Sequence, residues 1–215
     1  MKKIFLIMTC LMIAFSGISD AATKLILDKD TKLIPVGCKV GRLITFKGGA
    51  EVVFNDQGEV TEGTLAGTES FFPAGIGYRV VSNEYTRIDL QPAGIPFQGR
   101  IVFNEKGEVV SGKLGVQKVY FALDNAGKYL ELLWGKNVSF HPNGTVAEGT
   151  LTDDMLLRPI GWRNIKNETA GFIRFKGNSE IKLNPESEVL SGTLVEETKI
   201  GDKFYPAGTK LTFSE

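Results

Sequence analysis

Four stretches of this sequence align with one another without gaps, and this internal similarity constrains the fold more than any other feature. They are 51–65 (EVVFNDQGEVTEGTL), 100–114 (RIVFNEKGEVVSGKL), 137–151 (NVSFHPNGTVAEGTL) and 180–194 (EIKLNPESEVLSGTL). Each has an apolar residue two places before Phe or Leu, then a four-residue linker, a valine, and a Gly-Thr-Leu or Gly-Lys-Leu ending. A stretch that recurs in this way is expected to form one small structural element that packs against its neighbours.

The linker of each stretch predicts a tight hairpin turn. In the linker 55–58 (NDQG), the asparagine side chain can bond the backbone two residues on, and the glycine supplies the left-handed conformation that closes a type I turn. Proline at the second place fixes φ at about −65°, which this turn requires. The turn residues that we assign are Gly58, Gly107, Gly144, Pro142 and Pro185. Ser187 replaces the glycine in the fourth stretch, so that hairpin is expected to be less ideal.

The residues on either side of the linker predict strands with one apolar face. Val52 and Phe54 are two apart and share a face, whereas the residue between them varies in polarity among the four stretches. Val60 and Leu65 follow the turn and are five apart, so a bulge is needed to bring both to the core. We place this bulge at Gly63, because glycine favours such irregularities.

A second kind of turn signal alternates with these hairpins. The pattern Pro-x-Gly occurs at 35–37, 73–75, 92–94, 159–161 and 206–208. Short apolar runs lie between the turns, and no sustained helical periodicity follows the first 21 residues. The expected fold is therefore all-β, a repetitive antiparallel β-hairpin sheet that is stacked or rolled, with a β-barrel or a sandwich as the alternatives. About five units, counting a degenerate first one at 25–46, would form a single domain over 22–215.

The pattern Phe-x-x-x-Gly-x-Val-x-x-Gly at 54–63 resembles the MORN-type β-hairpin repeats, above all their bacterial variant. The resemblance covers 52–63 and its three counterparts. It implies a β-hairpin architecture that binds proteins or membrane surfaces and has no chemistry of its own.

The first 21 residues predict an export signal. Lys2 and Lys3 precede an apolar run at 4–15, and small residues end the segment at 19–21. This is the order of a secretory signal peptide, and the run is too short to cross a membrane, which takes about 20 residues. We expect cleavage after residue 21 and delivery to the periplasm, the cell surface or the medium. Cys38 is then the only cysteine, which excludes an intrachain disulfide and fits a small apolar residue better than a reactive thiol.

Charge and residue counts exclude several classes of function. The chain has 25 basic and 25 acidic side chains, which gives no basic footprint for nucleic acid. His141 is the only histidine, and it stands at the turn position that asparagine holds in the other three stretches. The carboxylate pairs at 28/30, 153–154 and 196–197 lack the spacing of a calcium loop. We predict no metal, no cofactor and no catalytic residue.

Aromatic and basic residues give the candidate ligand-binding set. Trp162 lies between Arg158 and Arg163 in an expected loop, and Tyr78 and Tyr85 each stand close to an arginine. Trp, Tyr and Arg are the residues that most often anchor binding surfaces. The alternative is that these side chains cover part of the core.

These observations predict an exported, non-enzymatic binding or structural module of the cell envelope, whose β surface meets a protein or a polysaccharide. One alternative is a hydrolase of envelope polysaccharide that uses two carboxylates facing a cleft. Another is a small outer-membrane β-barrel, although we do not expect membrane insertion. The sequence leaves the oligomeric state open.

Overall fold

The protein is described by a computed structural model that covers residues 22–38, 42–74, 94–115, 119–123, 129–165 and 169–214. Strands make up nearly all of its regular structure, and the exception is the short 3-10 helix η1 (Trp162–Asn164). This confirms the all-β expectation. The strands are β1 (Thr23–Ile26), β2 (Thr31–Leu33), β3 (Ile44–Phe46), β4 (Glu51–Phe54), β5 (Val60–Phe71), β6 (Ile95–Phe103), β7 (Val109–Leu114), β8 (Val119–Ala122), β9 (Tyr129–Leu132), β10 (Asn137–Phe140), β11 (Val146–Thr150), β12 (Met155–Leu157), β13 (Ile173–Phe175), β14 (Glu180–Leu183), β15 (Val189–Thr193), β16 (Thr198–Ile200), β17 (Lys203–Tyr205) and β18 (Lys210–Thr212).

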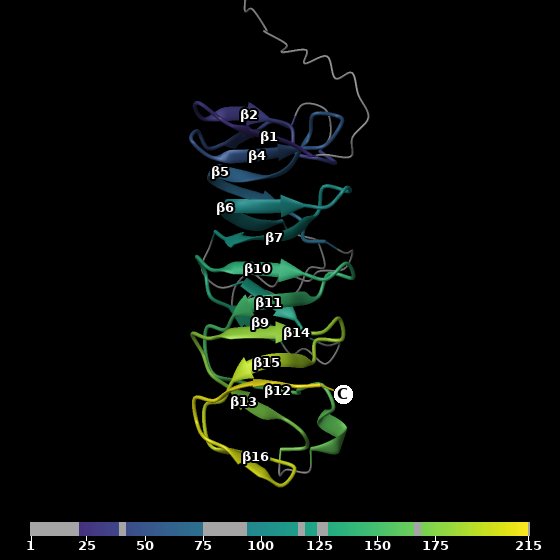
Figure 1. The fold of residues 1–215 in the computed structure, drawn as a ribbon, viewed down its shortest axis with the longest axis vertical. Coiled ribbons are helices and arrows are strands. Elements are labelled where there is room, and N and C mark those ends of the chain that lie inside the picture. The colour runs from purple at the N-terminus through teal and green to yellow at the C-terminus, as the bar shows by residue number, and fades with distance from the viewer. Residues whose placement is uncertain are drawn as a thin grey trace, which may run out of the picture.

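A 12-stranded antiparallel sheet, called the main sheet below, runs the length of the molecule (Figure 1). Its strand order is β1-β4-β5-β6-β7-β10-β11-β14-β15-β18, and the pair β2-β3 joins it through β5. The end strands β1 and β18 lie far apart and are not paired with each other in the part of the chain that the structure describes (Figure 1). The sheet is therefore an open stack rather than the rolled form.

The four aligned stretches form the hairpins β4-β5, β6-β7, β10-β11 and β14-β15, and all four share one irregular register. In the first hairpin Val53 faces Glu62 and Phe54 faces Val60, which leaves Thr61 as an extra residue. The same shift occurs in the other three hairpins. The bulge thus lies directly after the turn-flanking valine and not at Gly63, and it still brings Val60 and Leu65 to the core.

The glycine at the predicted bulge site has a different role. A Cβ on Gly63 would lie 2.7 Å from Cδ1 of the Phe46 ring, and one on Gly192 would lie 2.6 Å from Cδ1 of Phe175. Gly112 and Gly149 are equally close to a core side chain from β6 or β9. Glycine is needed here because a large core side chain packs directly against the backbone.

The hairpin turns explain the recurring asparagine and glutamate. The Asn55 side-chain oxygen accepts hydrogen bonds from the backbone N–H groups of Gln57 and Glu59, and its amide donates to the Glu59 carboxylate at 3.0 Å. Asn104 and Asn184 make the same contacts. The last turn residue has a positive φ in every hairpin, including Ser187 at 65°. The serine turn therefore keeps the geometry of the glycine turns.

The core lies between the inner face of the continuous row of strands from β1 to β18 and the short hairpins β2-β3, β8-β9 and β12-β13, of which the first is also joined to that row through β5. One cluster of buried side chains joins the two layers, from Leu27 near the start to Leu194 near the end. Phe46, Phe97 and Phe175 are fully buried within it. The Pro-x-Gly loops close its side, because Pro35, Pro73 and Pro159 form parallel bridges to the valine that starts β5, β7 or β15.

Candidate functional site

The outer face of the main sheet presents a continuous row of neighbouring side chains. Cross-strand pairing sets them side by side in the order Val53, Glu62, Val102, Ser111, Ser139, Glu148, Lys182 and Ser191. The row differs from hairpin to hairpin, whereas the inner face keeps the same apolar residues. Side chains that are free to vary in this way are those that the fold does not require.

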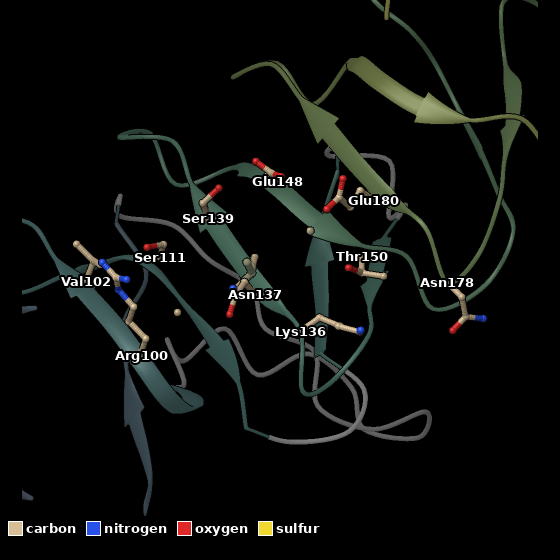
Figure 2. A pocket seen from close by; sticks show the side chains of 13 residues that line it. Arg100, Val102, Ser111, Lys136, Asn137, Ser139, Glu148, Thr150, Asn178 and Glu180 are labelled. Atoms are coloured by element: carbon tan, nitrogen blue, oxygen red, sulfur yellow. The ribbon is translucent and has the colours of Figure 1, made fainter. Parts of the chain in front are cut away.

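A groove of about 660 Å³ crosses the middle of this face (Figure 2). It spans β6, β7, β10, β11 and β14, and the side chains labelled in Figure 2 rise from these strands and from the turns beside them. We call it the outer groove. Its lining residues are Arg100, Val102, Ser111, Gly112, Lys136, Asn137, Val138, Ser139, Glu148, Gly149, Thr150, Asn178 and Glu180.

The outer groove exists because short side chains lie between two ion pairs. Arg100 forms a salt bridge with Glu62 on one side, and Lys182 forms one with Glu148 at 3.3 Å on the other. Between them Ser111 faces Ser139 across β7 and β10. The hydroxyl side chains are too short to fill the space, so the floor is low, polar and able to donate and accept hydrogen bonds.

Charge is divided between the two sides of the outer groove. Arg100 and Lys136 contribute positive groups, and Glu148 and Glu180 contribute carboxylates. Arg100, Glu148 and Glu180 are each also held in an ion pair with a neighbouring side chain. None of the described lining residues is aromatic. The surface therefore suits a polar ligand that carries both charges better than a flat sugar ring, which usually stacks on an aromatic side chain.

Two carboxylates in one groove raise the question of hydrolysis. A glycosidase pair needs one carboxyl group in an apolar environment that keeps it protonated. Glu148 and Glu180 each pair with a lysine, and their side chains are 44% and 60% exposed. Their surroundings are those of ordinary surface ion pairs, so the geometry favours binding over acid catalysis.

The predicted Arg158, Trp162 and Arg163 do come together, at the 3-10 helix η1. The Arg158 guanidinium carbon lies 3.8 Å from the centre of the Trp162 ring and 4.4 Å from that of Phe172. The Arg163 guanidinium lies 4.6 Å from the Trp162 ring. The indole N–H donates to Glu188 Oε1 at 3.0 Å, which ties the loop to the turn of the fourth hairpin. We call this group the indole cluster.

The indole cluster is built mainly as a contact within the protein. Two guanidinium groups already lie against the indole, and such cation–π contacts stabilise by about 0.5–2 kcal/mol each. Arg158 Nε is buried and has no hydrogen-bond partner, the one such side-chain atom in the described part of the chain. A role of these residues in ligand binding stays a prediction. Tyr78 and Tyr85 lie outside the described residues.

His141 and Cys38 are the remaining candidates from the sequence. His141 occupies its turn, and its Nε2 lies 2.9 Å from the carbonyl oxygen of Leu183 in the neighbouring hairpin. Cys38 is a half-buried free thiol. Burial raises its pKa, with Glu59 adding to the rise and Arg42 opposing it. A raised pKa reduces the thiolate fraction at neutral pH and so lowers the reactivity of this cysteine.

The described residues contain no group of three or more His, Cys, Asp or Glu that could hold a metal ion. No helix among them is both long and apolar enough to cross a membrane.

Comparisons with known proteins do not assign this chain to a family. No family model matches it, and neither a curated protein nor a solved structure does so.

The outer groove was not predicted from the sequence. Its floor is made by residues of different hairpins, and pairing across β7 and β10 brings Ser111 beside Ser139. The signal that could have found it is the residue between the two apolar positions of each first strand. This residue is Val53, Val102, Ser139 or Lys182 in the four stretches, and only the third is a small polar one.

Proposed function

We propose that this protein is an exported, non-enzymatic binding module of the cell envelope that holds an extended segment of a partner protein in the outer groove. The observation that carries the proposal is a polar groove of about 660 Å³ on the face of the sheet that the core does not use. Its hydroxyl floor and its charges of both signs match the polar backbone and mixed side chains of a peptide.

Export is part of the same proposal. The support is the order of Lys2, Lys3, the apolar run 4–15 and the small residues 19–21. A polysaccharide is the other partner class that the sequence suggested, and the absence of an aromatic residue among the described lining residues favours the protein.

The test is sedimentation with isolated cell envelopes. The full chain is produced in an exporting host, purified without detergent, and its N-terminus is read by mass spectrometry. The purified protein is then pelleted with intact envelopes and with protease-treated envelopes. We expect it to pellet with the first and to lose most of this binding with the second.

Two matched variants locate the binding surface. Ser139→Tyr fills the floor of the outer groove, and Glu51→Tyr places the same side chain at an exposed position on the same face of the first hairpin, outside the groove. We expect the first to weaken binding by about tenfold or more and the second to bind as the natural chain does. Equal binding by both variants would overturn the site, and binding that survives protease treatment would point to a polysaccharide.

A further inference from the structure

We propose that the two ends of the main sheet join, so that this protein assembles head to tail with further copies of itself. The strand β18 would pair with β1 of the next copy and complete a hairpin that each chain holds in two separate halves. This inference is independent of the proposed ligand.

The end strand β18 has the place of the first strand of a hairpin. It pairs with β15 as β14 pairs with β11, so that Leu211 faces Gly192 as Ile181 faces Gly149. The turns before the two strands also agree. The N–H of Leu194 donates to Thr209 O at 2.9 Å, as that of Leu151 donates to Ser179 O at 3.0 Å. In the part of the chain that the structure describes, no second strand pairs with the other edge of β18.

The opposite end strand, β1, has the place of a second strand. It pairs with β4 as β7 pairs with β10, with Leu25 facing Val52 where Gly112 faces Val138. The N–H of Leu27 donates to Ala50 O at 3.1 Å, as that of Leu114 donates to Lys136 O at 3.0 Å. In the described residues β1 has no first strand beside it. β1 of a second copy therefore fits the place of the second strand beside β18.

The chain after β1 leaves room for such a strand. The N–H of Gly48 donates to Asp30 Oδ1 at 2.8 Å, and the N–H of Gly177 donates to Asp154 Oδ1 at 2.8 Å, so β1 leads into β2 as β11 leads into β12. At β11 the corresponding edge is occupied by β10. The same local structure therefore accommodates a strand at the free edge of β1.

Apolar side chains at the two ends lack the cover that their counterparts have. Leu211 and Tyr205 are only partly buried, whereas Ile181 and Phe175 at the equivalent positions are fully buried. At the other end Leu25, on the inner face, is 51% exposed. Pairing of the two ends would remove this surface from water, and an unpaired strand edge is a template for such pairing.

A lysine on an exposed edge strand often prevents pairing with another chain, but the lysines of the two end strands here form ion pairs within their own sheet. Lys24 pairs with Glu51 at 3.1 Å, and Lys210 pairs with Glu180 at 3.1 Å. Their charge is balanced within each copy and does not oppose the approach of a second one.

We call the pairing of β18 with β1 of the next copy the joint. One position makes this joint weaker than the pairing inside a hairpin. Leu25 stands where the four hairpins have glycine, and the ring that would lie against it is Tyr205, the counterpart of Phe175. In an internal hairpin the glycine has no side chain, so the ring fills the space beside it. At the joint, Leu25 and Tyr205 must both fit into that space. We therefore expect Leu25→Gly to tighten the joint, whereas a non-specific apolar contact would be weakened by loss of this leucine.

The joint can be blocked at each end separately. Hydrogen bonds alternate between the two edges of a strand, and Leu27 and Phe213 bond inward, so the backbone groups of Lys24 and Thr212 face the free edges. Lys24→Pro and Thr212→Pro each remove one outward donor, which no internal strand pair uses. Lys24→Ala and Thr212→Ala remove the same side chains and keep the donor.

The experiment is sedimentation velocity of the purified chain over a range of concentrations. We expect the natural chain and both alanine variants to grow in mass with concentration, without a fixed end point, because a head-to-tail contact does not close on itself. Each proline variant should remain a monomer, and an equal mixture of the two should form a dimer through the one intact pair of ends. Circular dichroism of each variant checks that it is folded.

Three results would overturn the proposal. They are a natural chain that stays a monomer at all concentrations, a mixture of the two proline variants that forms no dimer, and a Leu25→Gly variant that associates more weakly than the natural chain. Each of these readouts is independent of binding to envelopes.

Discussion

The two faces of the main sheet follow different rules. On the inner face, the four hairpins repeat the same apolar pair, with Val52 and Phe54 in the first and Ile181 and Leu183 in the fourth. On the outer face, the residues at matching positions of the four hairpins differ from one another and include apolar, small, acidic and basic side chains. The inner face must match one core, whereas most residues of the outer row, apart from Val53 and Ser191, are at least partly exposed to solvent. The comparison separates the residues that specify the fold from those that are available for function.

The strongest test of the inner face is removal of a core ring. Phe175→Ala should lower the free energy of unfolding by about 3–5 kcal/mol, because a fully buried aromatic side chain leaves a cavity. Urea unfolding followed by circular dichroism measures the change. The neighbouring exposed Arg174→Ala is the control and should cost less than about 0.5 kcal/mol. Similar losses for the two variants would contradict the assignment of the faces.

A smaller effect is expected where the core ring meets glycine. Gly192→Ala places a Cβ 2.6 Å from Cδ1 of Phe175, and such overpacking costs about 1–3 kcal/mol. Thr193→Ala, one residue further and turned to the outer face, is the matched control in the same unfolding assay. A Gly192→Ala chain as stable as the natural one would show that the glycine serves another purpose.

The hairpin turns connect the ends of paired strands, and they should show an intermediate effect. Asn104→Ala removes the acceptor of the Lys106 and Glu108 N–H groups, which should cost about 1–2 kcal/mol. Lys106→Ala, in the same turn, leaves these bonds in place. If both variants unfold at the same urea concentration, the side-chain bonds of asparagine do not hold the turn.

The serine turn offers a gain rather than a loss. Ser187 has a φ of 65°, a conformation that costs a residue with a side chain about 1 kcal/mol and glycine almost nothing. Ser187→Gly should therefore raise the unfolding free energy by about that amount, while Ser187→Ala should not. An unchanged unfolding midpoint in the glycine variant would argue against strain in this turn.

The smallest effect on stability belongs to the outer face. Glu148→Gln breaks the pair with Lys182, and exposed pairs of this kind contribute about 0.2–1 kcal/mol. The same change should weaken binding to envelopes clearly, since Glu148 lines the outer groove. A large loss of stability with unchanged binding would reverse the roles that we give to the two faces.

The features that could be predicted from the sequence are those set by neighbours along the chain. The linker 55–58 contains its own turn chemistry, and Val52 and Phe54 show their shared face by spacing alone. The bulge was misplaced because spacing requires one extra residue between Val60 and Leu65 but does not say which. In the structure, Gly63 lies directly against the ring of Phe46, which belongs to a separate strand. No local sequence pattern reveals this contact.

The residues of the candidate sites also fall into two groups, those that are close in sequence and those that only strand pairing brings together. Arg158, Trp162 and Arg163 are close in sequence, and their proximity in space could be foreseen. The outer groove depends on Ser111 lying beside Ser139, which follows from pairing between two hairpins. A single sequence does not give the register of that pairing, so the groove could only be found in the structure.

The central claim is that the outer face of the main sheet is the binding surface, and carboxylate labelling tests it most directly. The chain is treated with a water-soluble carbodiimide and an amine, free and bound to envelopes, and each labelled carboxylate is quantified by mass spectrometry. We expect Glu148 and Glu180 to be protected in the bound form, while Glu51, on the same face but outside the groove, keeps its labelling. Unchanged labelling of Glu148 and Glu180 in a bound chain would contradict the account.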